Sequence, residues 1–203
     1  MYIDPVEKIQ REIGYKYVFK SSNYGTRTLD GRQFEVGNAI LSKIPFKGTE
    51  EHVVFGEYEV AKSLDECKNA IAKHSYTAQV AVLENGIAIV NYHGYWQKDP
   101  LGCEEAENCM EKVAEIIKAH DLPVVMCGDL NVVSEAPAMR KLDFLQDLTA
   151  KNEIKTTLRN LRFVKDVARD HILISEGLDC EKFEVIDVPV SDHRALVAEI
   201  KQI

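Results

Sequence analysis

Polar residues stand at the ends of several apolar runs, where side chains able to do acid–base and metal chemistry would gather at the edge of a sheet. In the run "VVMCGDLNVV" (124–133), Asp129 and Asn131 are two residues apart, so on a strand both side chains point to the same face. Such groups supply oxygen ligands for a hard cation, a base, and hydrogen-bond donors for a phosphate. The residues placed in this way are His93, Asp129, Asn131, Asp170, Asp192 and His193.

Each of these residues also has an ordinary structural interpretation. Asn and Asp stop strands because their side chains hydrogen-bond nearby backbone amides, and a single His or Asp at a strand end is more often a cap or a solvated loop group. The repetition of the pattern at several strand ends favours a site over independent caps.

The apolar periodicity predicts alternating helices and strands that would position these residues. Asn85-Gly86 between two β-rich runs is typical of a tight hairpin, and His93 follows the second run. Apolar residues recur at helical spacing from Cys103 to His120, which predicts an amphipathic helix. Further helices are expected at 5–13 and 138–148, and further strands at 15–21, 36–43, 123–131, 169–175, 182–188 and 195–200.

Composition places the chain among ordinary globular proteins. With 203 residues, 45% hydrophobic and 29% charged, we expect a single domain over 1–203. No apolar stretch approaches a membrane span and no signal-peptide pattern is present, so we expect a cytoplasmic protein. Five scattered cysteines without Cys-x-x-Cys spacing favour reduced thiols. The net charge of -8 argues against broad affinity for nucleic-acid backbones.

The ordered motifs "GNAILSK", "NYHGYW", "CGDLN", "RDHILIS" and "SDHRAL" resemble the endonuclease/exonuclease/phosphatase superfamily, which is deoxyribonuclease I-like. The resemblance runs from about Val36 to the C-terminus. It implies a four-layer α/β sandwich of two mostly antiparallel sheets, with the site at one edge of the sheets. The expected hairpin and the three late strands agree with antiparallel sheets better than with a doubly wound parallel one.

The resemblance implies Mg-dependent phosphoester hydrolysis, of the phosphodiesterase or nuclease kind, by in-line attack of water. His193 would be the general base, and Asp170 would hold its imidazole in the useful tautomer.

The remaining site residues would handle the cation and the phosphate. Asp192 would be a ligand to Mg²⁺ or Mn²⁺, with Asp129 and Asn131 at the other side of the ion. Asp129 would also orient or deprotonate the attacking water, while Asn131 and His93 would donate hydrogen bonds to the phosphoryl oxygens.

The chain departs from the family pattern in one respect. The family carries an Asn on its first strand and a metal-binding Glu at the end of a second early strand, whereas the first element expected here is the helix at 5–13. We therefore expect an N-terminally incomplete fold and weak Mg²⁺ binding. Either the chain is a shortened version of an enzyme, or it is a natural protein that has lost metal-dependent catalysis and serves as a binding or scaffold domain. Sheet edges left exposed would favour self-association.

The substrate stays open at the level of the sequence. Nucleic acid and a small phosphodiester or phosphomonoester are both compatible with it, although few basic residues are available to line a groove. Tyr95 and Trp96 follow His93 closely and could form a stacking wall for the leaving group, or could simply pack.

Overall fold

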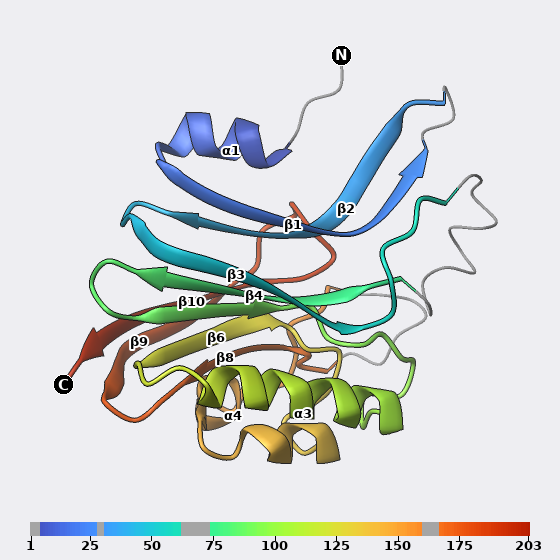
Figure 1. Cartoon of the computed structure of the whole chain (residues 1–203). Helices are drawn as coiled ribbons and strands as arrows, with labels where there is room; N and C mark the ends of the chain where they lie inside the picture. The colour runs from blue at the N-terminus through green and yellow to red at the C-terminus, as the bar shows by residue number, and fades with distance from the viewer. Residues whose placement is uncertain (1–4, 28–30, 62–73, 160–166) are drawn as a thin grey trace. The chain divides into compact units, whose positions relative to one another are not determined.

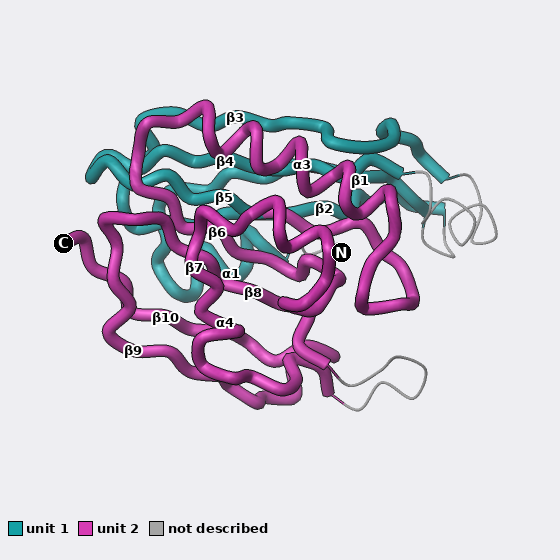
Figure 2. The backbone as a smooth tube through the Cα atoms, turned by 90° about the horizontal axis from the view of Figure 1, so that it is seen from below, with its two compact units in different colours: residues 1–91 teal, residues 92–203 magenta. Residues whose placement is uncertain are grey.

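The computed structural model describes residues 5–27, 31–61, 74–159 and 167–203. The chain divides into two compact units, residues 1–91 and 92–203, which Figure 2 distinguishes by colour. Each unit is described by itself below. The expectation of a single domain over 1–203 stays a prediction.

The first unit contains a helix and two groups of antiparallel strands. In the hairpin between its last two strands, Gly86 has a positive φ of 85° and its N–H donates to the carbonyl of Leu83 at 3.0 Å. This turn is the one that Asn85-Gly86 predicts. The strand order is β1-β2 in one sheet and β3-β4-β5 in the other. The elements are α1 (Pro5–Ile13), β1 (Tyr17–Arg27), β2 (Gln33–Ser42), β3 (Phe46–Phe55), β4 (Tyr76–Leu83) and β5 (Ala88–Tyr92).

The second unit places helical elements beside the strands that carry the candidate site (Figure 1). Its strand orders are β6-β8-β7 and β9-β10, with antiparallel pairing throughout. The elements are α3 (Glu104–Lys118), β6 (Val124–Asp129), the 3-10 helix η1 (Pro137–Leu142), β7 (Gln146–Asp147), α4 (Leu148–Lys151), β8 (Asp170–Ile174), β9 (Leu178–Ile186) and β10 (Ala195–Gln202).

Helix α3 follows the predicted amphipathic pattern. The residues that it buries recur at spacings of three and four, so they lie on one side of the helix and stabilise it by removing apolar surface from water. They are Ala106, Cys109, Met110, Val113, Ala114 and Ile117.

The predicted helix at 138–148 is wrong in its second half. The chain forms η1 and then the short strand β7, whose Gln146 and Asp147 pair with Ile174 and Leu173 of β8. The Asp147 carboxylate accepts hydrogen bonds from the backbone N–H groups of the second and third residues of α4, at 2.9 Å and 3.2 Å. Because this side chain caps a new helix, one continuous helix through position 147 does not form.

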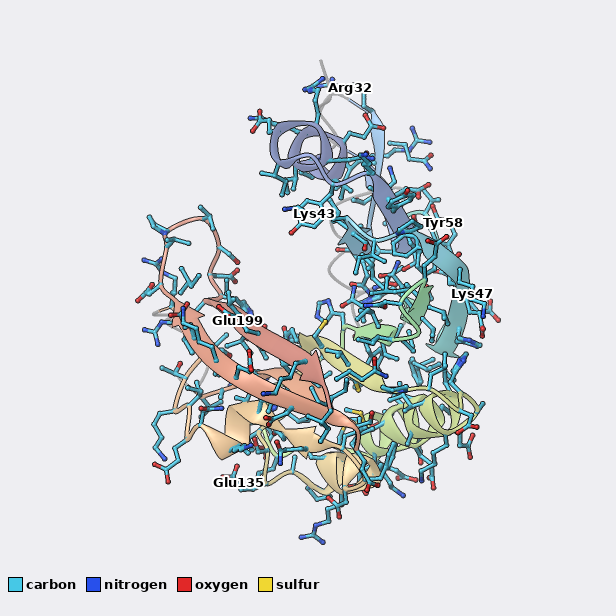
Figure 3. All side chains as sticks on the ribbon, turned by 90° about the vertical axis from the view of Figure 1, so that its left-hand side faces the viewer. Arg32, Lys43, Lys47, Tyr58, Glu135 and Glu199 are labelled. Atoms are coloured by element: carbon cyan, nitrogen blue, oxygen red, sulfur yellow. The ribbon has the colours of Figure 1, made fainter. Side chains whose placement is uncertain are left out.

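Strand β3 was missing from the sequence-based prediction. Most of its residues are exposed, so it lacks the alternation of apolar and polar residues that marks a half-buried strand. It lies at the end of its sheet among the described strands and carries charged side chains such as Lys47, which Figure 3 labels, and Glu50. Charged residues on an edge strand discourage pairing with another chain.

No helix within the described ranges is long and apolar enough to cross a membrane. The described part of the chain is thus mixed α/β with mostly antiparallel sheets, as the sequence predicts.

Candidate functional site

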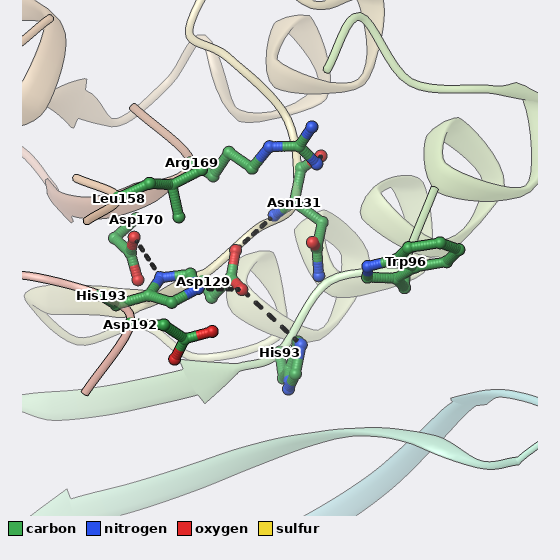
Figure 4. Close-up of a pocket in the computed structure, with 9 residues that line it drawn as sticks. All are labelled: His93, Trp96, Asp129, Asn131, Leu158, Arg169, Asp170, Asp192 and His193. Atoms are coloured by element: carbon green, nitrogen blue, oxygen red, sulfur yellow. Dashed lines mark hydrogen bonds and ion pairs between the residues drawn. The ribbon is translucent and has the colours of Figure 1, made fainter. Parts of the chain in front are cut away.

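Two carboxylates of the site are brought together by strand pairing. Strands β6 and β8 are antiparallel, and their register places Asp129 directly opposite Asp170. Cross-strand partners have Cβ atoms only about 4.5–5.5 Å apart, so the sheet itself holds two acids side by side. The two acids line a pocket of about 540 Å³ within the second unit (Figure 4). The lining residues are His93, Trp96, Asp129, Asn131, Leu158, Arg169, Asp170, Asp192 and His193. All six site residues expected from the sequence are among them.

His193 and Asp170 form a hydrogen-bonded pair, with Nδ1 of the imidazole 2.8 Å from Oδ2 of the carboxylate. The hydrogen bond and then the charge of Asp170 raise the pKa of His193 despite its partial burial. An isolated β-bridge between His193 and Leu158 fixes the backbone on which the imidazole stands. Since Nδ1 faces a carboxylate, Nε2 is the nitrogen left for exchange of a proton with a substrate or water.

Thr157 is a residue of the site that sequence analysis missed. Its hydroxyl donates to Oδ2 of Asp170 at 2.5 Å and accepts from the backbone N–H of Arg169 at 3.0 Å. The side chain is fully buried. No local pattern marks this threonine, because its partners are 12 and 13 residues away in sequence and are brought to it by the fold.

Asp129 stands between two imidazoles. Its Oδ2 lies 3.8 Å from Nε2 of His93 and 3.8 Å from Nε2 of His193. Its Oδ1 accepts the backbone N–H of Asn131 at 2.9 Å. Burial, and then the charge of Asp170, raise the pKa of Asp129, whereas the two histidines lower it. Burial and the neighbouring carboxylate thus outweigh the two histidines in their effect on the pKa of Asp129.

Asn131 is held in an unusual backbone conformation. Its φ is 59°, in the left-handed region that Asn tolerates better than most residues with a side chain. Its Nδ2 donates to the carbonyl of Gly94 at 3.0 Å, so one of the two amide N–H groups expected to face a phosphate is already engaged. Asn131 is buried, and its backbone carbonyl accepts from Gln97 and from Arg169.

Arg169 is a second residue that the sequence did not predict. Its side chain is only 3% exposed, and its Nη atoms donate to the carbonyls of Gln97, Lys98 and Asn131 at 3.1–3.2 Å. Burial lowers the pKa of this guanidinium, while the charge of Asp129 raises it.

Behind the site, His171 of β8 is buried with an acceptor at each ring nitrogen. Nδ1 lies 3.0 Å from Oδ2 of Asp147, and Nε2 lies 2.9 Å from the carbonyl of Val132. Burial disfavours its charge, but the hydrogen bonds and the charge of Asp147 outweigh burial and raise the pKa of His171. Burial likewise raises the pKa of Asp147, and the bonds from His171 and Ser134 outweigh this and lower it.

Three residues bring possible metal-ligating atoms within 4.8 Å of one another, namely Asp129, Asp170 and His193. This set overlaps with the ligands expected from the sequence only at Asp129. Asp192 lines the pocket but is exposed, and its Oδ1 accepts from Ser191 at 3.3 Å. Within the described ranges, no glutamate lines the pocket.

The family profile described as "Endonuclease/Exonuclease/phosphatase family" matches residues 4–193. The chain belongs to this family. No relative among curated proteins matches the sequence.

Solved structures of family proteins share the fold at low sequence identity. An endonuclease/exonuclease/phosphatase from Beutenbergia cavernae DSM 12333 is 16% identical with a TM-score of 0.67, and the match covers 97% of this chain and 56% of that one. The mannosyl-6-phosphatase of Bacteroides thetaiotaomicron is 15% identical with a TM-score of 0.61, and the match covers 96% of this chain and 80% of that one. A 3′ phosphatase from Neisseria bound to a product DNA hairpin is 15% identical with a TM-score of 0.62, and the match covers 98% of this chain and 83% of that one. The chain therefore has the deoxyribonuclease I-like fold and spans just over half of the first protein.

Proposed function

We propose that this protein is a divalent-metal-dependent phosphoester hydrolase that acts by in-line attack of water. The observation that carries the proposal is the His193–Asp170 pair at 2.8 Å beside the buried carboxylate of Asp129, in a chain that matches the family over residues 4–193. A base, a group that orients water and hydrogen-bond donors to the phosphoryl oxygens each contribute to phosphoester hydrolysis.

His193 accepts a proton at Nε2, and Asp170 holds the ring in the tautomer that leaves this nitrogen free of hydrogen. The carboxylate also stabilises the imidazolium that forms. Asp129, whose Oδ2 is 3.8 Å from the same Nε2, orients the water that attacks phosphorus. As negative charge builds on the phosphoryl oxygens, His93 and the second N–H of the Asn131 amide donate hydrogen bonds to them.

The donor set fits a hard cation such as Mg²⁺ or Mn²⁺. The raised pKa of Asp129 reflects a carboxylate whose negative charge is poorly compensated, and a cation would offset that cost. The ion would be held by Asp129, Asp192 and the side-chain oxygen Oδ1 of Asn131, because Asp170 and His193 already bind each other. When bound, the ion neutralises charge on the phosphoryl oxygens and acidifies a water. With two carboxylates, we expect weak binding.

Relatives of the same fold suggest the class of substrate. One is named a mannosyl-6-phosphatase and another a 3′ phosphatase bound to a DNA hairpin. Phosphate esters of sugars or nucleotides are therefore the first substrates to try. The second candidate function is a catalytically impaired binding domain, and it is favoured by the scarcity of carboxylate ligands in the described pocket.

The test is release of p-nitrophenol from bis(p-nitrophenyl) phosphate and from p-nitrophenyl phosphate, with Mg²⁺, Mn²⁺ or EDTA. His193→Ala serves as the control for contaminating enzymes. Hydrolysis that needs the ion and His193 would support the proposal. If the purified chain binds Mg²⁺ in calorimetry but releases no product under any condition, the binding-domain function is the better one.

We also propose that sheet edges allow self-association. Among the strands that the structure describes, β10 pairs only with β9, and a two-stranded sheet presents two outer edges that another chain could extend. Light scattering over a range of protein concentrations tests this proposal, and a constant monomer mass would contradict it.

A further inference from the structure

Trp96 is an accessible aromatic side chain at the wall of the pocket. It is the only tryptophan of the chain, and the residue is 50% exposed although it lines the same pocket as the His193–Asp170 pair. In the close-up it stands on the far side of His93 from His193 (Figure 4). A half-exposed indole beside reacting groups leaves aromatic surface within reach of a ligand.

The segment that carries Trp96 is fixed at its N-terminal side to the strand end that carries the site. The N–H of Gly94 donates to the carbonyl of Asp129 at 2.8 Å, and the side chain of Asn131 donates to the carbonyl of Gly94 at 3.0 Å. The position of the indole is therefore tied to that of two site residues.

Arg169 fixes the same segment at its C-terminal side. Its guanidinium donates to the carbonyls of Gln97 and Lys98 at 3.2 Å and 3.1 Å, and also to that of Asn131 at 3.2 Å. The Gln97 amide adds a 2.7 Å hydrogen bond to the same carbonyl of Asn131. A buried cation whose Nη atoms bind main-chain carbonyls on both segments acts as a clamp, so Trp96 is preorganised rather than ordered by the ligand.

Among the residues that line the pocket, Trp96 is the one best suited to contact the leaving group. Among the nine lining residues the apolar side chains are Trp96 and Leu158, and Leu158 is only 2% exposed. Among the lining residues that the structure describes, the one basic side chain of the Lys or Arg type is Arg169. Its Nη atoms already donate hydrogen bonds to main-chain carbonyls. A pocket of this kind, in a chain of net charge -8, is poorly suited to hold an extended polyanion.

We infer that Trp96 is a specificity-determining residue that stacks on a planar ring, of nucleobase size, carried by the leaving group, and that Arg169 is the positioning residue that holds it. The inference rests on the proposed hydrolase function for the identity of the leaving group, but the stacking itself can be measured without turnover. Stacking on an aromatic side chain tolerates any base, because every base has a π-face.

The binding test uses Trp96 as its own reporter, because it is the sole tryptophan. Fluorescence excited at the red edge of indole absorption is titrated with AMP and with ribose 5-phosphate, which carries the same phosphate without the ring. We expect saturable quenching by AMP and a response at least about tenfold weaker per concentration from ribose 5-phosphate. Equal responses to the two compounds, or none to AMP, would overturn the inference.

The kinetic test compares phosphate release from the same two esters. Trp96→Leu should lower the kcat/KM ratio of AMP to ribose 5-phosphate about tenfold, and Trp96→Phe, which keeps a ring, should largely preserve it. Phe144→Leu is the matched control, since Phe144 is an exposed aromatic residue that lies outside this pocket against Lys118. A ratio unchanged in Trp96→Leu would sink the inference and leave the hydrolase function standing. Quenching by AMP but not by ribose 5-phosphate, with hydrolysis of neither ester, would support the stacking role of Trp96 and contradict the hydrolase function.

The role of Arg169 has a readout separate from activity. Arg169→Met should increase the rate of acrylamide quenching of Trp96 and lower its anisotropy, because the carbonyls of Gln97 and Lys98 lose their donor. Arg169→Lys should recover part of this change. Unchanged indole mobility in a folded Arg169→Met protein would contradict the positioning role.

Discussion

The Nδ1 atom of His193 and the hydroxyl of Thr157 meet on the same carboxylate oxygen, Oδ2 of Asp170, at 2.8 Å and 2.5 Å. The carboxylate is thus fixed by a buried side chain before it orients the imidazole. An acid that accepts two such bonds has little freedom to rotate, so the direction of the His193 ring depends on Thr157 as well as on Asp170.

Replacing Thr157 should therefore impair chemistry rather than binding. We expect Thr157→Val to lower kcat by roughly tenfold while KM changes little, since a hydrogen bond to a charged group contributes about 1.5–3 kcal/mol. Thr157→Ser, which keeps the hydroxyl, should recover most of the activity. Steady-state kinetics with a p-nitrophenyl ester measure both constants. Full activity in Thr157→Val would show that the hydroxyl is not needed, and would contradict the prediction.

The pH dependence of hydrolysis should reflect the raised pKa of His193. The base works only when neutral, so activity should rise with pH through a pKa above the ordinary value of about 6.5. In Asp170→Asn the chief cause of the shift is gone, and the rising limb should move to lower pH while the maximum rate falls. Profiles of kcat/KM from pH 5 to 9 test this. A limb at the same pH in both proteins would mean that another group titrates.

The buried His171–Asp147 pair predicts a pH-dependent contribution to stability. The raised pKa of His171 stabilises the fold fully below its unfolded value of about 6.5, and this contribution is lost as pH rises through the folded value. The lowered pKa of Asp147 stabilises the fold fully above its unfolded value of about 3.9, and this contribution is lost as pH falls through the folded value. The pair should thus stabilise most between about pH 4 and 6.5.

Urea unfolding of His171→Gln tests that window. We expect a loss of about 3–5 kcal/mol near pH 5, since a buried ionic partner is removed, and a smaller loss at pH 9. His52→Gln is the control, because His52 pairs with Glu50 at 3.0 Å on the surface, where such pairs contribute less than about 1 kcal/mol. An equal loss for His171→Gln at both pH values would indicate a neutral imidazole.

Gly94 should not tolerate a side chain. A Cβ atom at this position would lie 2.1 Å from the carbonyl oxygen of Leu130, so the segment carrying His93 would have to move away from the residue that follows β6. We expect Gly94→Ala to cost about 1–3 kcal/mol of unfolding free energy. Gly48→Ala, whose Cβ would meet nothing within 4 Å, is the matched control. Thermal melts that coincide for the two variants would contradict the prediction.

The parts of the fold that the sequence predicts are those set by local rules. Helix α3 and the hairpin at Asn85-Gly86 follow from apolar period and turn chemistry, and the strand-end pattern leads to six of the seven polar residues, Arg169 being the seventh, that line the pocket. Strand β3 could not be predicted in this way, because its side chains are mostly exposed and its position depends on pairing with β4.

The supporting residues of the site were beyond local rules for a similar reason. Thr157 and Arg169 look like ordinary residues of a polar segment, and their importance comes from partners far along the chain, such as the carbonyls of Gln97 and Lys98. A buried arginine that binds main-chain carbonyls leaves no signature in spacing or composition. The metal ligands predicted from the resemblance stay a prediction.

The register that sets Asp129 opposite Asp170 has a consequence for folding. The two strands are distant in sequence, so the cost of closing the intervening loop has to be met before the two acids meet. The polar cluster therefore forms only once β6 and β8 have paired, and no local fragment of the chain can contain it. Any ligand of the cluster then binds the folded state alone, and raises the free energy of unfolding with the logarithm of its concentration relative to its Kd.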